Sequence, residues 1–169
     1  KEELIHSEDP ARKTDVTLIS TAYYFQICRM MEGYAHMQQL KDDAKWFQQE
    51  AAATKEAFNR EYLTVKKGTA TVPNHILYPD STYYGYNTVT ANLLPYYFGM
   101  IDDPYVRKQV EKQIVKAITD QNLGTITTGV IGTGWLMHGL SMMGRTDLAW
   151  LLATNKKYPS WGYMAEHDD

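Results

Sequence analysis

Two long segments with helical periodicity, separated by only a few residues, constrain this chain more than any other feature of its sequence. In the first, from residue 16 to 36, apolar side chains recur every three or four positions: Leu18, Ala22, Phe25, Cys28 or Met30, and Met31. In the second, from residue 41 to about 62, the same period gives Ala44, Phe47, Ala51, Thr54 and Phe58. Helices joined by so short a turn run antiparallel, so the sequence predicts a helical hairpin.

Shorter helices are expected to continue this arrangement. Residues 87–100 have helical character, with a kink or a restart at Pro95. An aspartate-proline pair opens a further helix over residues 103–119, since proline suits the first helical position. Residues 135–143 form another helix, and Thr146 or its neighbour Asp147 caps the last one. The sequence thus predicts about six helices in three successive pairs.

The predicted organisation is a single all-α unit. Residues 1–13 are polar and indicate a linker or an arriving loop, and residues 14–169 hold the helices. Residues 63–86 break the helical pattern and predict a long loop, within which residues 69–72 are the one candidate strand. The tail at residues 158–164 is aromatic and expected to be irregular.

Composition excludes several classes of function. The net charge of −3, from 17 basic and 20 acidic residues, argues against nucleic acid or an anionic membrane as partner. No apolar run reaches the ~18 residues that span a bilayer. The single cysteine, Cys28, excludes an internal disulfide. The five histidines lack metal-ligand spacing, so neither a metal nor a cofactor is expected: His6, His36, His75, His138 and His167.

The glycine-rich stretch at residues 129–134 is not expected to bind phosphate. A phosphate-binding loop places Lys and then Ser or Thr after its last glycine, whereas here Trp135 and Leu136 follow. A dinucleotide fingerprint also needs a preceding strand, which a chain of helical hairpins lacks. We expect these glycines to allow close packing at a helix start, with the neighbouring threonines lining a polar pocket.

Aromatic residues are the unusual part of the composition, with thirteen tyrosines and four tryptophans. Rings on a surface suit flat apolar ligands such as sugars. The predicted loop at residues 63–86 carries four of the tyrosines, and long loops are often functional: Tyr78, Tyr83, Tyr84 and Tyr86. These rings either face a ligand or fix the loop to the body of the protein.

The order and spacing of several motifs resemble the catalytic domain of bacterial α-L-rhamnosidases across roughly residues 15–164. Two blocks carry most of the resemblance, Thr128-Gly129-Val130-Ile131-Gly132-Thr133 and Tyr158-Pro159-Ser160-Trp161-Gly162-Tyr163-Met164. Three further blocks support it: Thr21-Ala22-Tyr23-Tyr24 with Leu40-Lys41-Asp42-Asp43-Ala44, Lys55-Glu56-Ala57-Phe58-Asn59, and Gly144-Arg145-Thr146-Asp147-Leu148-Ala149.

This resemblance implies an (α/α)6 barrel of six helical hairpins around a central pocket, of which this chain would form about half. It also implies an inverting exo-glycosidase that removes terminal α-L-rhamnose from glycosides or polysaccharides, without a cofactor. The expected substrate-binding residues are Tyr84, Tyr86, Thr128, Trp161 and Tyr163. The expected partners are rhamnosides, and either the remainder of the same polypeptide or a second copy that covers the open half-barrel.

No catalytic residue is assigned within the 169 residues. The family's acidic block lies upstream of the first hairpin, and Ser7-Glu8-Asp9-Pro10-Ala11-Arg12 is too short to match it. Its general base lies in a Thr-Thr-x-Trp-Glu run beyond the tail motif, which Glu166 does not match. Val89 also departs from the family, where glutamine is frequent. We therefore expect the chain to be inactive alone.

Two alternatives remain at this point. A helical-repeat interaction module would show a fixed period near ~34 residues, but the hairpins here differ in length. Another helical-barrel carbohydrate enzyme, such as a different glycosidase or a sugar lyase, predicts the same hairpins with other site residues. The compartment is not determined by the sequence, although a periplasmic or extracellular location is expected for the parent enzyme.

Overall fold

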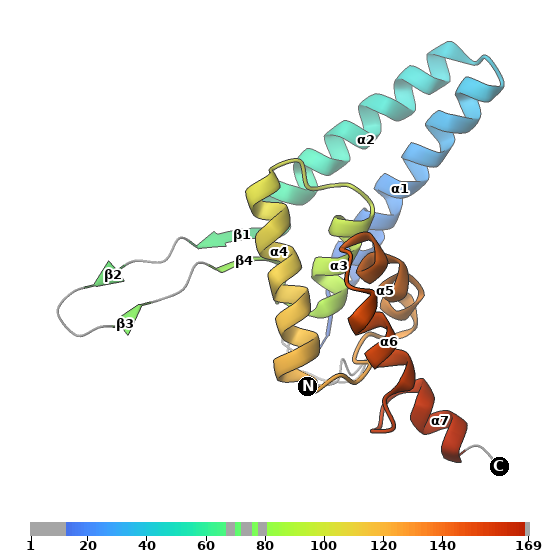
Figure 1. Ribbon diagram of the computed structural model, residues 1–169. Helices are drawn as coiled ribbons and strands as arrows, with labels where there is room; N and C mark the ends of the chain where they lie inside the picture. Colours follow the sequence, from blue (N-terminus) through green and yellow to red (C-terminus); the bar gives the residue numbers. More distant parts are fainter. Residues whose placement is uncertain (1–12, 67–69, 72–75, 78–80, 168–169) are drawn as a thin grey trace.

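The computed structural model describes residues 13–66, 70–71, 76–77 and 81–167. Helices dominate these residues, among which there are seven α-helices and four short strands (Figure 1). The mainly helical fold class is therefore confirmed. The linker expected at residues 1–13 lies outside the described residues except for Lys13. No helix of the described ranges is long and apolar enough to cross a membrane.

The first two helices form the predicted hairpin, α1 (Val16–Met37) with α2 (Lys41–Tyr62). Asp15 caps α1, because its Oδ1 accepts hydrogen bonds from the N–H groups of Thr17 at 2.6 Å and Leu18 at 3.4 Å. Figure 1 shows the far end of this hairpin extending away from the other helices. The hairpin is long because the helical periodicity of apolar residues continues without interruption on both sides of one tight turn.

The second pair consists of α3 (Val89–Tyr97) and α4 (Pro104–Lys116), and a π-helical turn, η2 (Ala117–Gln121), continues α4. The side chains of Thr88 and Asp103 cap the two helices by accepting hydrogen bonds from backbone N–H groups. Helix α3 contains a proline near its end without restarting. Both helices are shorter than the first pair, and they contact each other as predicted.

The third pair, α5 (Val130–Met142) with α6 (Thr146–Thr154), is followed by α7 (Trp161–His167). Three expectations about these elements are wrong. Neither Thr146 nor Asp147 caps α6, since the N-cap residue is Arg145 and no side chain makes a capping hydrogen bond there. Helix α5 begins five positions before the expected start at residue 135, because packing against α3 outweighs the low helix propensity of glycine. The tail is helical from Trp161 onward, because the hydroxyl of Ser160 accepts the N–H of Tyr163 and caps the turn.

Residues 63–86 were expected to form a long loop, but the described residues of this segment include four short strands. Strand β1 (Leu63–Lys66) pairs antiparallel with β4 (Ser81–Tyr84), and β2 (Ala70–Thr71) pairs with β3 (Ile76–Leu77). The candidate strand at residues 69–72 overlaps β2, while its two ends and Tyr78 lie outside the described residues. Figure 1 shows these strands pointing away from the helices. Cross-strand hydrogen bonds stabilise this segment without any helical period.

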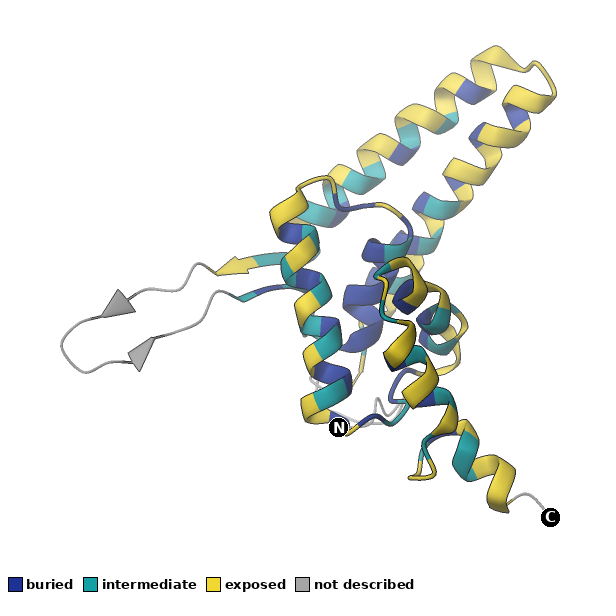
Figure 2. Ribbon diagram, in the orientation of Figure 1, coloured by how far each residue is buried: buried dark blue, intermediate teal, exposed yellow. Residues whose placement is uncertain are grey.

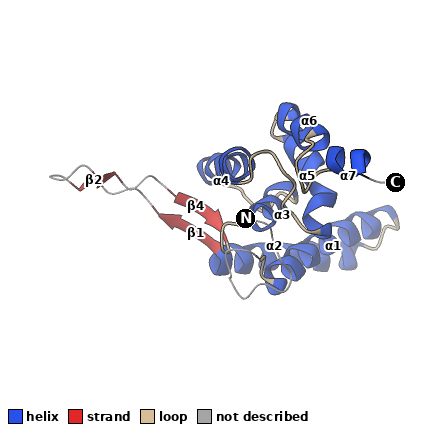
Figure 3. Ribbon diagram, turned by 90° about the horizontal axis from the view of Figure 1, so that it is seen from below, coloured by secondary structure: helices blue, strands red, loops and turns tan. Residues whose placement is uncertain are grey.

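Helix α3 is the centre of the fold. Every residue from Val89 to Tyr96 is buried, which makes α3 the darkest helix in Figure 2. It contacts α1, α4, α5 and β4, and Figure 3 shows it surrounded by these elements. A helix without a polar face must be enclosed on all sides, so the hairpins pack around α3.

Two glycines let α5 approach α3 closely. A Cβ atom at Gly132 would lie 2.3 Å from Oγ1 of Thr90, and one at Gly139 would lie 2.4 Å from Cδ1 of Leu93. Both partners belong to α3, and both glycines are buried on α5. The close packing expected of the glycines at residues 129–134 is confirmed at Gly132, while nothing lies within 4 Å of the Cβ positions of Gly129 and Gly134. Gly139 lies outside the stretch for which it was expected.

Replacing Gly132 tests this contact. Gly132→Ala is expected to lower the free energy of unfolding by about 1–3 kcal/mol, because the added methyl overpacks the interface. Gly134→Ala is the matched control on the same helix, since nothing lies within 4 Å of its Cβ position. Alanine favours helix there, so stability is kept or raised by up to ~1 kcal/mol. Urea unfolding measures both, and equal changes would contradict the packing role.

Thr82 allows a test of opposite sign. It is fully buried on β4, and its hydroxyl has no hydrogen-bond partner within the described part of the chain. Thr82→Val removes this unsatisfied hydroxyl at nearly constant volume, so we expect a gain of about 1 kcal/mol in unfolding free energy. Thr64→Val on the paired strand changes a half-exposed hydroxyl and is expected to give a smaller gain. A destabilised Thr82→Val protein would reveal a partner for this hydroxyl.

Candidate functional site

A groove with a volume of about 620 Å³ lies between α5 and the start of α7. One face of α5 forms the first wall, with positions that recur every three or four residues: Val130, Thr133, Gly134, Met137 and His138. The other lining residues come from the segment before α5 and from the tail: Ile126, Thr128, Pro159, Ser160, Trp161 and Met164. The groove is thus mostly apolar, with a few hydroxyl groups and one imidazole.

Thr128 lies at the base of the α5 wall and is almost fully buried. The hydroxyl of Thr133 donates to the carbonyl oxygen of Thr128 at 2.9 Å, and the two side-chain hydroxyls are also 2.9 Å apart. Since the Thr133 proton is used by that carbonyl, the Thr128 hydroxyl donates to Thr133. The first turn of α5 is thereby fixed to the segment that precedes it.

Trp161 forms the opposite wall at the start of α7. Its side chain is 40% exposed, which leaves part of the indole face free for a ligand. Ser160 is buried beside it and caps α7 through the N–H of Tyr163 at 3.1 Å. The carbonyl oxygen of Pro159 accepts a hydrogen bond from the N–H of Ile126 at 2.9 Å, which joins the two lining segments directly.

Of the predicted binding residues, the structure brings Thr128 and Trp161 together in one groove. Tyr163 belongs to the same helix as Trp161, but its ring stacks on His167 with centroids 4.1 Å apart and does not line the groove. Tyr86 is exposed in the turn after β4 and is not among the lining residues either.

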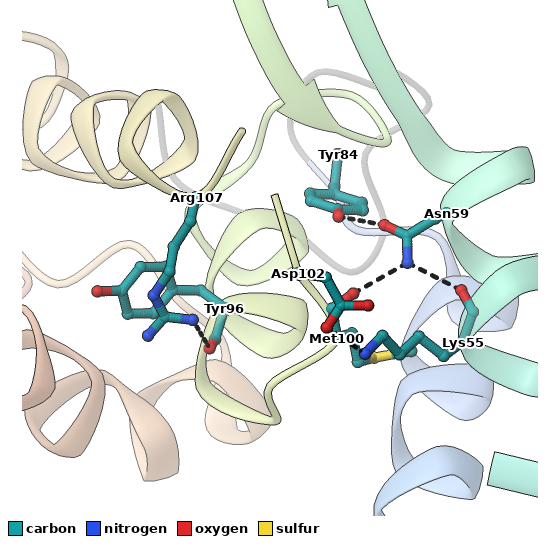
Figure 4. A network of polar contacts seen from close by, with 7 residues as sticks. All are labelled: Lys55, Asn59, Tyr84, Tyr96, Met100, Asp102 and Arg107. Carbon is teal, nitrogen blue, oxygen red and sulfur yellow. Dashed lines mark hydrogen bonds and ion pairs between the residues drawn. The ribbon is translucent and has the colours of Figure 1, made fainter. Parts of the chain in front are cut away.

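Tyr84 lies elsewhere, in the core, and this differs from its predicted role. It has no exposed surface, and its hydroxyl donates to Oδ1 of Asn59 at 2.5 Å. The amide of Asn59 in turn donates to the carbonyl oxygens of Met100 at 3.0 Å and Lys55 at 2.8 Å (Figure 4). Burial raises the pKa of the Tyr84 phenol well above its usual value. In this arrangement the Tyr84 ring fixes β4 to the helices. This corresponds to the second of the two roles expected for the loop tyrosines, that of fixing the loop to the body of the protein.

His138 is a lining residue that the sequence analysis missed. Its ring lies against Tyr97 with centroids 6.3 Å apart, and Tyr97 packs on Trp135 at 5.1 Å. The indole N–H of Trp135 donates to the hydroxyl of Tyr23 at 2.6 Å, which connects this aromatic cluster to α1. The sequence feature that could have indicated His138 is the three- and four-residue spacing of the groove-lining positions along α5. This spacing can be recognised only if the helix is taken to begin at Val130.

The groove can bind a ligand, but it holds no acid–base pair. Among the described residues, none of those that line it is an aspartate or a glutamate. Glu166, on the same helix as Trp161, forms an ion pair with Lys156. No group of three metal-ligating side chains occurs in the described ranges. The groups that this groove offers to a ligand are an indole face, hydroxyl groups and an imidazole.

Comparison with known proteins identifies the family. The sequence profile of the bacterial alpha-L-rhamnosidase 6 hairpin glycosidase domain matches residues 2–169. An α-L-rhamnosidase of Formosa agariphila is 25% identical over 154 residues, which cover 91% of this chain and 15% of that protein. One of Alteromonas sp. is 29% identical over 154 residues, covering 89% of this chain and 15% of that protein. The chain thus spans about 15% of the length of these relatives.

Solved structures share the fold. The α-L-rhamnosidase from Dictyoglumus thermophilum superposes with a TM-score of 0.78 at 21% identity, over 98% of this chain and 17% of that one. The α-L-rhamnosidase of Streptomyces avermitilis, complexed with L-rhamnose, superposes with a TM-score of 0.75 at 22% identity, over 98% of this chain and 14% of that one. The α-L-rhamnosidase of Aspergillus terreus superposes with a TM-score of 0.75 at 23% identity, over 94% of this chain and 16% of that one. This chain therefore belongs to the bacterial α-L-rhamnosidase six-hairpin glycosidase domain family, and its described residues form three of those hairpins.

Proposed function

We propose that this chain is part of the catalytic domain of a protein that hydrolyses terminal α-L-rhamnosides with inversion. One observation carries the proposal. The two blocks on which the family resemblance mainly depends, residues 128–133 and 158–164, are separated by residues 134–157 and line opposite walls of one groove.

The groove suits a deoxy sugar. Rhamnose has an apolar face and a methyl group, which favour contact with the half-exposed indole of Trp161 and with Met137. The hydroxyls of Thr128 and Thr133 and the ring of His138 offer hydrogen-bonding groups for its hydroxyls. The apolar surface supplies affinity, while the few polar groups orient the ring.

The acid–base pair belongs to residues outside this groove lining. In an inverting glycosidase a carboxylic acid protonates the leaving oxygen, while a carboxylate roughly 6.5–9.5 Å away activates water on the opposite face. We infer that other parts of the polypeptide supply both groups. The groove residues then hold the sugar between them.

The first hairpin indicates where further chain packs. Its apolar residues are exposed along much of α1 and at the following turn: Ile27 53%, Met30 47%, Tyr34 49%, Met37 68% and Leu40 51%. Figure 2 shows how little of this hairpin is covered. An exposed apolar face of this kind marks an interaction surface. We infer that the remainder of the same polypeptide covers it, with a second copy of the chain as the alternative.

The complete protein tests the reaction. Hydrolysis of 4-nitrophenyl α-L-rhamnoside should be readily detected, and proton NMR should show β-L-rhamnose as the first product because inversion replaces the α configuration. Release of α-L-rhamnose first would contradict inversion. Absence of hydrolysis, with related α-glycosides cleaved instead, would contradict the substrate.

Trp161→Ala in the complete protein tests the groove. We expect KM for the rhamnoside to rise about tenfold, which corresponds to about 1.4 kcal/mol of lost ring contact. Trp150→Ala is the matched control, since Trp150 is 71% exposed on α6 and does not line the groove. Steady-state kinetics at a temperature where both variants are folded separates them, and equal KM values would place the sugar elsewhere.

The 169-residue chain alone should not hydrolyse rhamnosides, because its groove has no acid–base pair. The measurement is prolonged incubation with 4-nitrophenyl α-L-rhamnoside at high protein concentration. Activity that persists through successive purification steps, and that is lost on Glu166→Gln, would show that this chain contains its own catalytic carboxylate.

A further inference from the structure

Behind the groove, a single amide side chain connects the segments that form its two walls. Asn155 follows the end of α6, and its Nδ2 donates to the carbonyl oxygen of Gly124 at 2.5 Å. Its Oδ1 accepts the backbone N–H of Lys157 at 2.9 Å. One side chain therefore contacts both the segment that leads to Thr128 and the segment that leads to Trp161.

The backbone of Asn155 extends this connection to α7. Its carbonyl oxygen accepts a hydrogen bond from the hydroxyl of Ser160, the residue that caps α7. A Cβ atom at Gly162 would lie only 2.6 Å from the same carbonyl oxygen, so the first turn of α7 packs directly on it. A shift of Asn155 would displace Trp161, the next residue after the cap.

Gly124 is a defined point on the other side. Its backbone has φ of +73°, which favours glycine, and side chains of α6 fill the space where a Cβ would be. Two residues later, the N–H of Ile126 bonds to the carbonyl oxygen of Pro159. Together with the Asn155 amide, this makes two cross-links between the walls.

We propose that Asn155 is a positioning residue that sets the spacing of Thr128 and Trp161 and thereby the affinity of the groove for the sugar. The inference rests on the proposed function for the identity of the ligand. An amide is required because the position needs a donor toward Gly124 and an acceptor for Lys157 at once. A carboxylate keeps the acceptor, loses the donor, and faces a carbonyl oxygen.

The test uses Asn155→Asp and Asn155→Ala in the complete protein. We expect KM for the rhamnoside to rise about tenfold with kcat within about twofold, since the groove is widened while the acid–base pair is untouched. For Asn155→Asp, the ratio of its KM to that of the parent protein should fall toward one as pH is lowered. The protonated carboxyl then donates to Gly124 again.

Asn59→Asp is the matched control. The Asn155 amide donates to the carbonyl oxygens of Gly124 and, at 3.4 Å, Leu123, and the Asn59 amide likewise donates to two backbone carbonyls and accepts one hydrogen bond. Asn59 lies on α2, where it binds Tyr84 of β4 away from the groove. Its KM ratio should stay near one at every pH, although stability falls. An equal rise in KM for both variants would reduce the effect of Asn155 to general destabilisation and overturn the proposal.

Hydrogen exchange provides a readout that needs no activity. In the Asn155 variants, the amides of Ile126 and Tyr163 should exchange faster, while amides in α4 remain protected. If the parent protein does not cleave rhamnosides, the proposed function fails. The positioning role of Asn155 is then overturned only if hydrogen exchange at Ile126 and Tyr163 is unchanged in the Asn155 variants. If the parent protein does cleave them, an unchanged KM overturns the proposal whatever the exchange. Asn155→Ser, which keeps one hydrogen bond, replaces the other variants if they do not fold.

Discussion

The enclosure of α3 is the constraint on which the rest of the structure depends. A helix buried from Val89 to Tyr96 has no face that tolerates water, so α1, α4, α5 and β4 must all pack against it. Burying a leucine or valine contributes roughly 1.5–3 kcal/mol, and α3 carries several such side chains. The three hairpins are thus held by one shared helix as well as by contacts within each pair.

The same constraint sets the position of the groove. Helix α5 approaches α3 at Gly132 and Gly139, where any larger residue would clash. This contact orients α5 so that Thr133, Met137 and His138 line the groove. The contact with α3 and the lining of the groove therefore use different faces of one helix, and the two glycines help to determine where the groove-lining side chains lie.

Local patterns in the sequence predicted the helices well where one face is apolar and the ends carry capping residues. Helix α1, capped by Asp15, and the start of α4 at Asp103 and Pro104 follow both patterns. Helix α2 follows the apolar pattern without a side-chain cap. Two of the failures, the start of α5 and the pairing of β1 with β4, share a cause, because both depend on contacts between residues distant in the sequence. The helical tail instead begins at a local cap, the hydroxyl of Ser160. Helix α5 begins at Val130 only because α3 accommodates its glycines, and β1 finds β4 across a long connection.

The candidate site was predictable to the extent that it depends on single motifs. Thr128 and Trp161 were selected because each belongs to a recognisable block, and of the five predicted binding residues only these two line the groove. Their contact with a sugar stays a prediction. Tyr84 was selected for its place in an aromatic loop, but burial against Phe58 and a hydrogen bond to Asn59 place it in the core. His138 was missed because its position on the groove face depends on where α5 starts. The high content of tyrosine and tryptophan suggests that aromatic side chains take part in binding, but composition alone does not identify which of them face a ligand.

The hydrogen bonds behind the groove bear on how binding and catalysis are divided in such a domain. The walls are joined by contacts made entirely within residues 122–164, through Asn155 and the Ile126–Pro159 hydrogen bond. These hydrogen bonds involve no residue of the exposed α1–α2 hairpin, where further chain is inferred to pack, although Trp135 of α5 also donates to Tyr23 of α1. Under the proposed function, the sugar meets a surface that is already formed within this chain, and other parts of the polypeptide supply the acid–base pair. Preorganisation of this kind lowers the entropic cost of reaching the transition state, because the binding geometry is fixed before the substrate arrives.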